Sequence, residues 1–138
     1  MTGILPVDKP EGPTSHDVVA MARRALGVRR IGHTGTLDPF ATGLLLLCVG
    51  PATRLAEYFS DLSKTYEATA RLGVATDTLD RTGSTVSTSE AWRELSPDAI
   101  REAFQAEGGT RLQQPPAYSA KRIGGRRSHE LAREGGAP

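Results

Sequence analysis

Apolar and polar residues in the first part of the chain follow two different periods. The pattern over residues 3–8 predicts a short strand, and Pro6 assigns it to a sheet edge because proline has no backbone N–H to donate. Apolar positions over residues 18–26 recur with helical spacing. We therefore expect an amphipathic helix with Ser15 as its N-cap and Gly27 as its end.

The next segment predicts a long loop that leads into a strand. Residues 29–39 contain two glycines, two threonines and a proline, a composition that does not sustain regular structure. Residues 44–49 are apolar at every position and are followed by Gly50 and Pro51. They predict a central strand that is buried on both faces. The loop is therefore expected to enter the core directly.

The middle of the chain predicts one more helix and one more strand. Residues 52–62 have helical spacing, and the side chains expected on the inner face are Leu55, Tyr58, Phe59 and Leu62. Residues 65–74 alternate between apolar and polar, which predicts a half-buried strand with Tyr66 on its inner face. A polar loop and a return strand over residues 84–87 are expected to follow.

The rest of the sequence predicts a third helix, a hairpin and a helical turn, and the whole set of elements indicates the fold class. Ser96 as N-cap and Pro97 in the first turn predict a third helix that ends at Gly108. Residues 118–127 predict a hairpin through paired glycines, and residues 128–134 predict a short helical turn. Interspersed helices and strands indicate the α+β class, with a mixed, largely antiparallel sheet flanked by helices.

Composition narrows the class of protein. A length of 138 residues fits one domain, and 38% hydrophobic with 24% charged residues is typical of a globular chain. The longest apolar run is too short to cross a bilayer, and no secretion signal is present, so we expect a cytoplasmic protein. Cys48 is the only cysteine, which excludes disulfide frameworks and CxxC zinc sites.

Charge is sorted along the chain, although the whole sequence carries only +1. Residues 1–53 sum to +1, residues 54–109 to −4 and residues 110–138 to +4. The basic residues of the last segment are Arg111, Lys121, Arg122, Arg126, Arg127 and Arg133. Gathered on one face they would attract phosphates, but charge alone favours an ordinary solvated surface.

Asp38 is the residue best placed for catalysis. It lies in the glycine-rich loop directly before the predicted buried strand, where a rigid scaffold would hold an exposed side chain. The alternative is an Asp-Pro turn in which the carboxylate accepts backbone hydrogen bonds.

The other residues of the loop do not indicate a metal or nucleotide site. No second His, Cys or carboxylate lies at metal-ligand spacing from His33, so no metal site is expected. The glycines match neither the GxxxxGK(S/T) nor the GxGxxG phosphate-binding motif.

The same loop carries a resemblance to a known family. Residues 32–45, GHTGTLDPFATGLL, resemble the catalytic motif of the TruB-type tRNA pseudouridine-55 synthases, which the catalytic subunit of H/ACA guide-RNA particles shares. Three further blocks occur in the family's order, namely Asp8-Lys9-Pro10 with Gly12, Thr14 and Ser15; Lys64-Thr65-Tyr66 with Thr76, Asp77 and Asp80; and residues 114–120, QPPAYSA. The resemblance spans almost the whole chain.

The resemblance implies an isomerase that acts on the T-arm of tRNA as a monomer, without a metal or cofactor. The bond between uracil N1 and ribose C1′ is cut, the base turns, and C5 is joined to C1′. Asp38 is implied to be the essential carboxylate, and covalent and proton-transfer routes both stay open. A neighbouring cation would keep that carboxylate ionised.

The resemblance also implies how the RNA is held. Extruding the target base costs roughly a few kcal/mol. His33 is implied to fill the space that the base leaves, and Tyr66 is implied to stack on the extruded uracil. The alternative for Tyr66 is an ordinary core tyrosine. Lys9 either buttresses the active-site loop or meets RNA, and a surface lysine in a turn is the competing account. Contacts to the RNA backbone are implied for Lys121, Arg122, Arg126 and Arg127.

The sequence departs from the family in two respects. His129 stands where the family more often has a tyrosine, so no role is carried over to it. Family members also continue with the rest of the catalytic sheet, a basic residue that pairs with the aspartate, and a PUA-type RNA-binding domain. We therefore expect residues 1–138 to be an N-terminal part of the catalytic domain that binds T-arm RNA weakly and converts it poorly.

Two rival functions are open at this point. The first is a guide-RNA-dependent, H/ACA-type pseudouridine synthase subunit, which would perform the same chemistry on a target chosen by an RNA partner. The second is a non-catalytic tRNA-binding or folding module. The complete motif around Asp38 argues against the second, because a protein that only binds RNA has no need of a carboxylate there.

Overall fold

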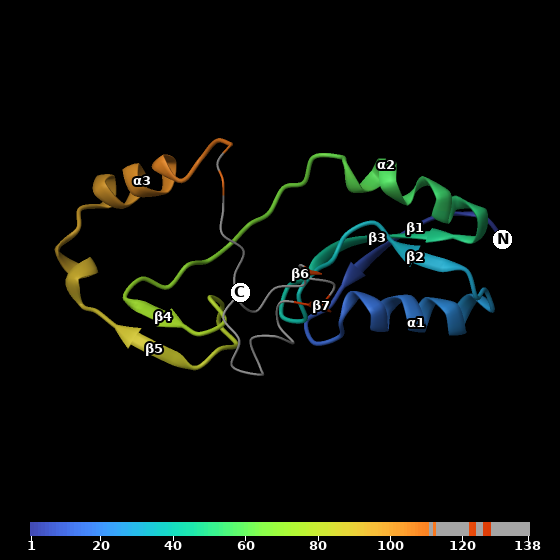
Figure 1. Ribbon diagram of the computed structural model, residues 1–138, viewed down its shortest axis with the longest axis horizontal. Coiled ribbons are helices and arrows are strands. Elements are labelled where there is room, and N and C mark those ends of the chain that lie inside the picture. The colour runs from blue at the N-terminus through green and yellow to red at the C-terminus, as the bar shows by residue number, and fades with distance from the viewer. Residues whose placement is uncertain (111, 113–121, 124–125, 128–138) are drawn as a thin grey trace. The chain divides into compact units, whose positions relative to one another are not determined.

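The computed structural model describes residues 1–110, 112, 122–123 and 126–127. The chain divides into two compact units, Met1–Glu67 and Ala68–Pro138, whereas the length alone suggests a single core. Helices are interspersed among antiparallel strands in both units, which confirms the α+β class (Figure 1). No helix in the described part of the chain is long and apolar enough to cross a membrane.

The first unit is built on a three-stranded antiparallel sheet. Its strands are β1 (Gly3–Lys9), β2 (Ile31–His33) and β3 (Gly43–Val49), in the order β1-β3-β2 (Figure 1). The edge position predicted for the first strand and the central position predicted for residues 44–49 are both confirmed. The strand β2 lies inside the segment that was predicted to be a long loop. Its three residues contain a glycine and have no local strand pattern, and they form a strand because they pair with β3.

The central strand is buried on both faces only at one end. Leu47 and Cys48 are fully buried, whereas Leu44 is 67% exposed. The prediction of a strand buried on both faces along its whole length is therefore wrong at its first residue, Leu44, whereas Leu45 is buried. Leu44 lies where β3 leaves the loop that contains Asp38, so the strand is exposed next to the candidate site.

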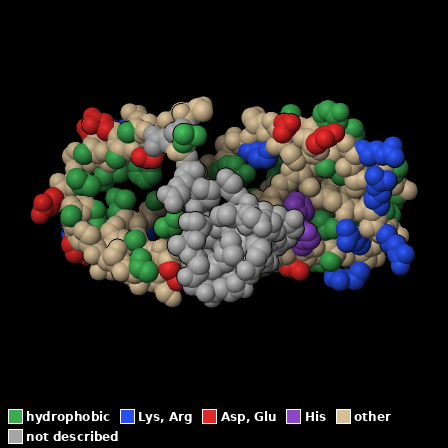
Figure 2. Space-filling model, viewed as in Figure 1, with side chains coloured by type: hydrophobic (Ala, Val, Ile, Leu, Met, Phe, Trp, Pro, Cys, Tyr) green, Lys and Arg blue, Asp and Glu red, His purple; other side chains and the backbone are tan. Residues whose placement is uncertain are grey.

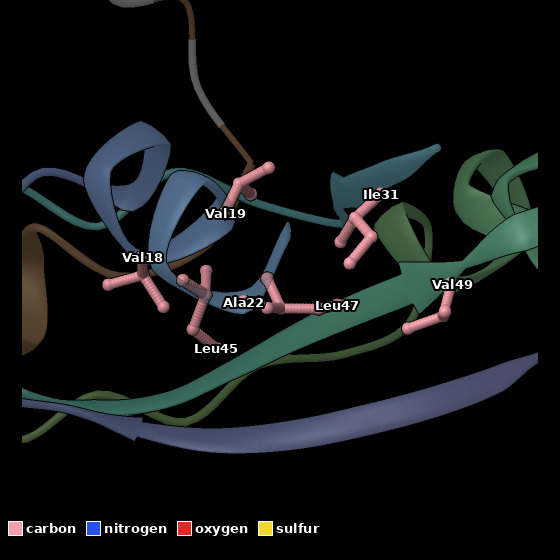
Figure 3. Packing of buried hydrophobic residues seen from close by; sticks show 7 residues of the cluster. All are labelled: Val18, Val19, Ala22, Ile31, Leu45, Leu47 and Val49. Carbon is pink, nitrogen blue, oxygen red and sulfur yellow. The ribbon is translucent and has the colours of Figure 1, made fainter. Parts of the chain in front are cut away.

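The helix α1 (Ser15–Leu26) packs on this sheet and closes the core. The buried apolar side chains come from α1, β2 and β3, and they are Val18, Val19, Ala22, Ile31, Leu45, Leu47 and Val49 (Figure 3). Gly27 ends the helix in the left-handed conformation, as predicted. The N-cap is Thr14 and not Ser15, because Thr14 and Asp17 form a reciprocal capping box.

Replacing the cap tests this assignment. The Thr14 side chain accepts the backbone N–H of Asp17 at 3.1 Å, and Thr14→Ala removes that acceptor. We expect the free energy of unfolding to fall by about 1 kcal/mol, measured by urea denaturation. Thr69→Ala, in an exposed segment without helix or strand, is the control and should change little. Equal effects of the two substitutions would contradict the capping role.

The predicted second helix is replaced by two short pieces. A 3₁₀ helix η1 (Gly50–Leu55) leads into α2 (Ala56–Ser60). Three of the side chains predicted to face inward, those of Leu55, Tyr58 and Leu62, are exposed. The helical spacing of these apolar residues is real, but no described element of this unit covers that face.

The strand predicted over residues 65–74 is also wrong. The structure has no strand over residues 61–73, the next strand being β4 (Val74–Thr76), and residues 61–71 are exposed. Alternation alone does not make a strand, because an extended segment needs a partner for its backbone groups. The division between the two compact units falls within this segment, after Glu67.

The second unit contains short elements. The strand β4 pairs antiparallel with β5 (Thr85–Thr88), which confirms the predicted return strand, and a 3₁₀ helix η2 (Ala91–Glu94) follows. The helix α3 (Pro97–Ala106) is capped by Ser96 as predicted. The strands β6 (Arg122–Ile123) and β7 (Arg126–Arg127) pair antiparallel, which confirms the predicted hairpin for these four residues, while residues 118–121 and 124–125 lie outside the described residues. The helical turn predicted over residues 128–134 lies outside the described residues.

Candidate active-site loop

Asp38 lies in the loop between β2 and β3. Its backbone carbonyl accepts the N–H of Ala41 at 3.0 Å, so the Asp-Pro turn considered above is present. The side chain, however, is exposed, and no described residue donates a hydrogen bond to its carboxylate. The turn is therefore closed by the main chain, and the carboxylate remains accessible to a ligand.

A buried lysine holds one flank of this turn. Lys9, at the end of β1, is fully buried, and its Nζ donates to three backbone carbonyls, those of Ala41 at 2.7 Å, Pro10 at 3.0 Å and Pro39 at 3.2 Å. An ammonium group has three N–H donors, and all are used. Because Lys9 is fully buried, the interpretation as a surface lysine in a turn is wrong. The geometry favours the buttressing account.

Ser15 holds the other flank. Its hydroxyl donates to the Leu37 carbonyl at 3.2 Å and accepts the Leu37 N–H at 3.0 Å. Sequence reasoning assigned Ser15 to the helix cap and missed this contact. Two consecutive hydroxyl residues at a helix start were the available signal, since only one of them can occupy the cap. A backbone bond from Gly12 to the Pro39 carbonyl, at 2.8 Å, adds a further link.

His33 lies at the end of β2, immediately before the loop. Its ring meets that of His16 edge to face, with the ring centroids 5.2 Å apart. The Nδ1 atom is buried and has no hydrogen-bond partner among the described residues. Burial lowers the pKa of His33, and the neighbouring His16 lowers it further, while the Gly35 backbone acts weakly in the opposite sense. His16, on α1, is a neighbour that sequence reasoning missed.

The lowered pKa of His33 gives a pH prediction. We expect its imidazole to titrate below 6.5 in an NMR experiment on the folded chain. The unfolded chain then binds more protons, so the free energy of unfolding falls as the pH drops through and below this value. His16→Asn should raise the His33 midpoint part of the way, because burial remains. A midpoint at or above 6.5, or one that His16→Asn leaves unchanged, would contradict the assigned causes.

Tyr66 is not where the sequence places it. It lies outside any strand and is 68% exposed, so both the inner-face position and the core alternative are wrong. A connection to the loop exists a few residues earlier, where the Ser60 hydroxyl donates to the Thr34 carbonyl at 2.8 Å. This bond ties α2 to the start of the Asp38 loop, and Tyr66 follows α2 along the chain.

The predicted basic contacts are described only in part. Arg122 and Arg127 are paired across β6 and β7, as are Ile123 and Arg126. Lys121 and His129 lie outside the described residues.

Within the described part of the chain, no group of three His, Cys, Asp or Glu side chains could hold a metal ion. Cys48 is a buried thiol whose pKa is raised by burial.

The fold and the loop together match one family of enzymes. A sequence match to the TruB family of pseudouridylate synthases, N-terminal domain, covers residues 23–137. This range is most of the chain and includes the whole Asp38 loop. The chain therefore belongs to the TruB family.

Individual relatives agree with this assignment. The chain is 49% identical to the tRNA pseudouridine synthase B of Syntrophobacter fumaroxidans and 50% identical to that of Corynebacterium jeikeium, over 97% of this chain and 44% of each relative. A crystal structure of a Cbf5-Nop10-Gar1 complex superposes with a TM-score of 0.57 and 26% identity, over 87% of this chain and 31% of that one. The chain spans less than half the length of the curated relatives it matches.

Proposed function

We propose that the intact protein converts a uridine in the T-loop of tRNA, at position 55, to pseudouridine, and that residues 1–138 form an N-terminal part of its catalytic domain. The observation that carries the proposal is the exposed Asp38 carboxylate on a turn that Lys9 and Ser15 fix from both sides. The names of the curated relatives, tRNA pseudouridine synthase B, support the substrate class.

The proposed reaction is an isomerisation, so atoms balance without a co-substrate. The N1–C1′ bond breaks, the C5–C1′ bond forms, C5 loses its proton, and N1 gains one. Asp38 would act at the ribose, either by forming a bond to C1′ or by accepting a proton. Both roles require a carboxylate held within about 3.5 Å of the reacting atom, which is what a fixed turn provides.

Base extrusion is the costly step before chemistry. Taking a base out of its stack costs roughly a few kcal/mol, and stacking on an aromatic ring returns about 1–3 kcal/mol. We propose that His33 occupies the vacated space and that the exposed ring of Tyr66 stacks on the extruded uracil. A lowered pKa keeps His33 neutral near pH 7, which suits contact with a base more than with a phosphate.

The remaining predicted contacts concern the RNA backbone. We propose that Lys121, Arg122, Arg126 and Arg127 bind phosphates and position the RNA without reading its sequence. Recognition would then depend on the folded shape of the T-arm.

Two substrates separate this proposal from the guide-RNA rival. The intact protein is incubated with an unmodified tRNA transcript and with a T-arm hairpin, both without guide RNA, and the products are analysed as nucleosides. We expect pseudouridine at position 55 in both. Conversion that appears only when a guide RNA is supplied would favour the H/ACA-type alternative and overturn the proposal.

A further inference from the structure

Five arginines gather at the end of the first unit that is opposite the Asp38 loop. They form what we call the arginine patch, and they are Arg23, Arg24, Arg29, Arg30 and Arg54. All five are exposed, and Figure 2 shows Lys and Arg side chains gathered at the right-hand end of this unit. Between Asp17 and Glu57 the sequence contains these five arginines and a single carboxylate, that of Asp38.

The topology separates the arginine patch from that carboxylate. Asp38 lies where β2 ends and β3 begins, whereas Arg29 and Arg30 precede β2 and Arg54 follows β3. The seven-residue strand β3 runs between the two ends, which places them about 20 Å apart at about 3.4 Å per residue. No described carboxylate forms an ion pair with any of the five arginines.

Local contacts fix part of the patch and leave the rest free. Arg23 Nη2 donates to the Ile31 carbonyl at 2.7 Å, and Arg30 Nε donates to the Thr53 hydroxyl at 2.7 Å. The side chains of Arg24, Arg29 and Arg54 make no hydrogen bond to a described residue. A shallow groove of about 610 Å³ is lined by Arg23, Arg24, Gly27, Val28 and Arg29.

Stabilisation of the helix end does not explain the patch. Cations in the last turn of α1 interact favourably with the helix dipole, which accounts for Arg23 and Arg24. Arg29, Arg30 and Arg54 lie beyond the helix, and gathering them costs repulsion that nearby carboxylates do not offset. An anionic partner would offset it, and guanidinium groups bind phosphates with paired N–H donors.

We propose that the arginine patch binds backbone phosphates of the substrate RNA, about 20 Å from the nucleotide at Asp38. This inference rests on the proposed function for the identity of the ligand. A distance of about 20 Å spans several stacked nucleotides of a duplex, so the patch would hold a part of the RNA outside the modified loop. It adds a second basic surface to the one predicted in the last segment of the chain.

The test uses the triple variant R24Q/R29Q/R54Q, because these side chains make no described hydrogen bond that the change would break. Binding of the intact protein to an unmodified tRNA transcript is measured over a series of salt concentrations. We expect the Kd to rise about 10- to 100-fold at about 0.1 M salt, and the slope of log K against log salt to weaken by about 2 to 3. The melting temperature should stay within about 2 °C of the parent.

The matched control is R71Q/R93Q/R101Q, which removes the same charge from the second unit. Arg93 and Arg101 are already paired with Glu90 and Asp98, so binding should change little. The variant R24K/R29K/R54K keeps the charge and should keep the parent slope. An unchanged slope in the glutamine variant, an equal loss in the control, or the same loss in the lysine variant would overturn the proposal.

Failure of the patch and failure of the proposed function give different results. If the parent protein binds tRNA and modifies it while R24Q/R29Q/R54Q binds equally well, only the patch is overturned. If the parent protein binds no tRNA, the proposed function fails. The substitution Asp38→Asn is expected to reduce conversion by at least about 100-fold while leaving the salt slope unchanged, because no phosphate contact is proposed for Asp38.

Discussion

Asp38→Asn is expected to reduce pseudouridine formation by the intact protein by at least about 10²- to 10⁴-fold. The amide has nearly the shape of the carboxylate, but near neutral pH it can neither attack C1′ nor accept a proton. The backbone bond from Ala41 to the position-38 carbonyl does not depend on the side chain, so the turn should remain intact. Single-turnover nucleoside analysis of a tRNA transcript measures the effect.

Asp61→Asn is the matched control, because Asp61 is an exposed aspartate of the same unit that lies at the end of α2. It should leave the rate unchanged. Binding of RNA by Asp38→Asn, measured in parallel, should stay within about 3-fold of the parent, since the change is confined to one exposed group. Undiminished conversion by Asp38→Asn would remove the catalytic assignment and favour a non-catalytic binding module.

Lys9→Met is expected to have the largest effect on stability, lowering the free energy of unfolding by about 3 kcal/mol. Methionine nearly matches the length and volume of the lysine side chain but donates no hydrogen bond. The carbonyls of Pro10, Pro39 and Ala41 would lose their buried donor. The turn would loosen, and a shift of about 1 Å at Asp38 can cost about 100-fold in rate.

Lys64→Met provides a close control for this change. Lys64 Nζ also donates to backbone carbonyls, those of Ser60 at 2.7 Å and Leu62 at 2.9 Å, but the residue is exposed. Water can replace its bonds, so the loss should stay below about 1 kcal/mol. Chemical denaturation of the two variants and the parent compares them directly. Equal losses would mean that burial of the Lys9 ammonium does not matter, and the buttressing account would be wrong.

The elements that sequence reasoning identified have local signals. The β1 and β3 strands, the Gly27 helix end and the Ser96 cap each follow from residues within a few positions of one another. The β2 strand has no such signal, since its three residues depend on pairing with Val49, Cys48 and Leu47. Residues 65–74 show the reverse case. Their alternating pattern predicted a strand, but residues 65–73 form none because they have no partner strand.

The candidate site was identified only in part for the same reason. Asp38 and His33 stand out from their loop and from the resemblance of the surrounding motif. The residues that fix the loop lie far away in sequence, with a separation of 32 positions from Lys9 to Ala41 and of 22 from Ser15 to Leu37. No periodicity connects such pairs, so their contacts become visible only when the chain is folded.

The arginine patch shows a different limit of sequence reasoning. Counting charge over residues 1–53 gives only +1, because four acidic residues nearly cancel the five basic ones. The fold separates the two kinds of charge, placing Arg24 and Arg29 at one end of the unit and Asp38 at the other. A net charge therefore hides a surface whose charge is concentrated in space.

The most direct test of the account is the structure of the intact Asp38→Asn protein bound to an unmodified tRNA T-arm. We expect the target uridine to be extruded, with the amide of residue 38 within about 3.5 Å of ribose C1′. A side chain at position 38 that points into solvent, with the uridine still stacked in its loop or bound elsewhere, would contradict the assignment of this residue to the reaction.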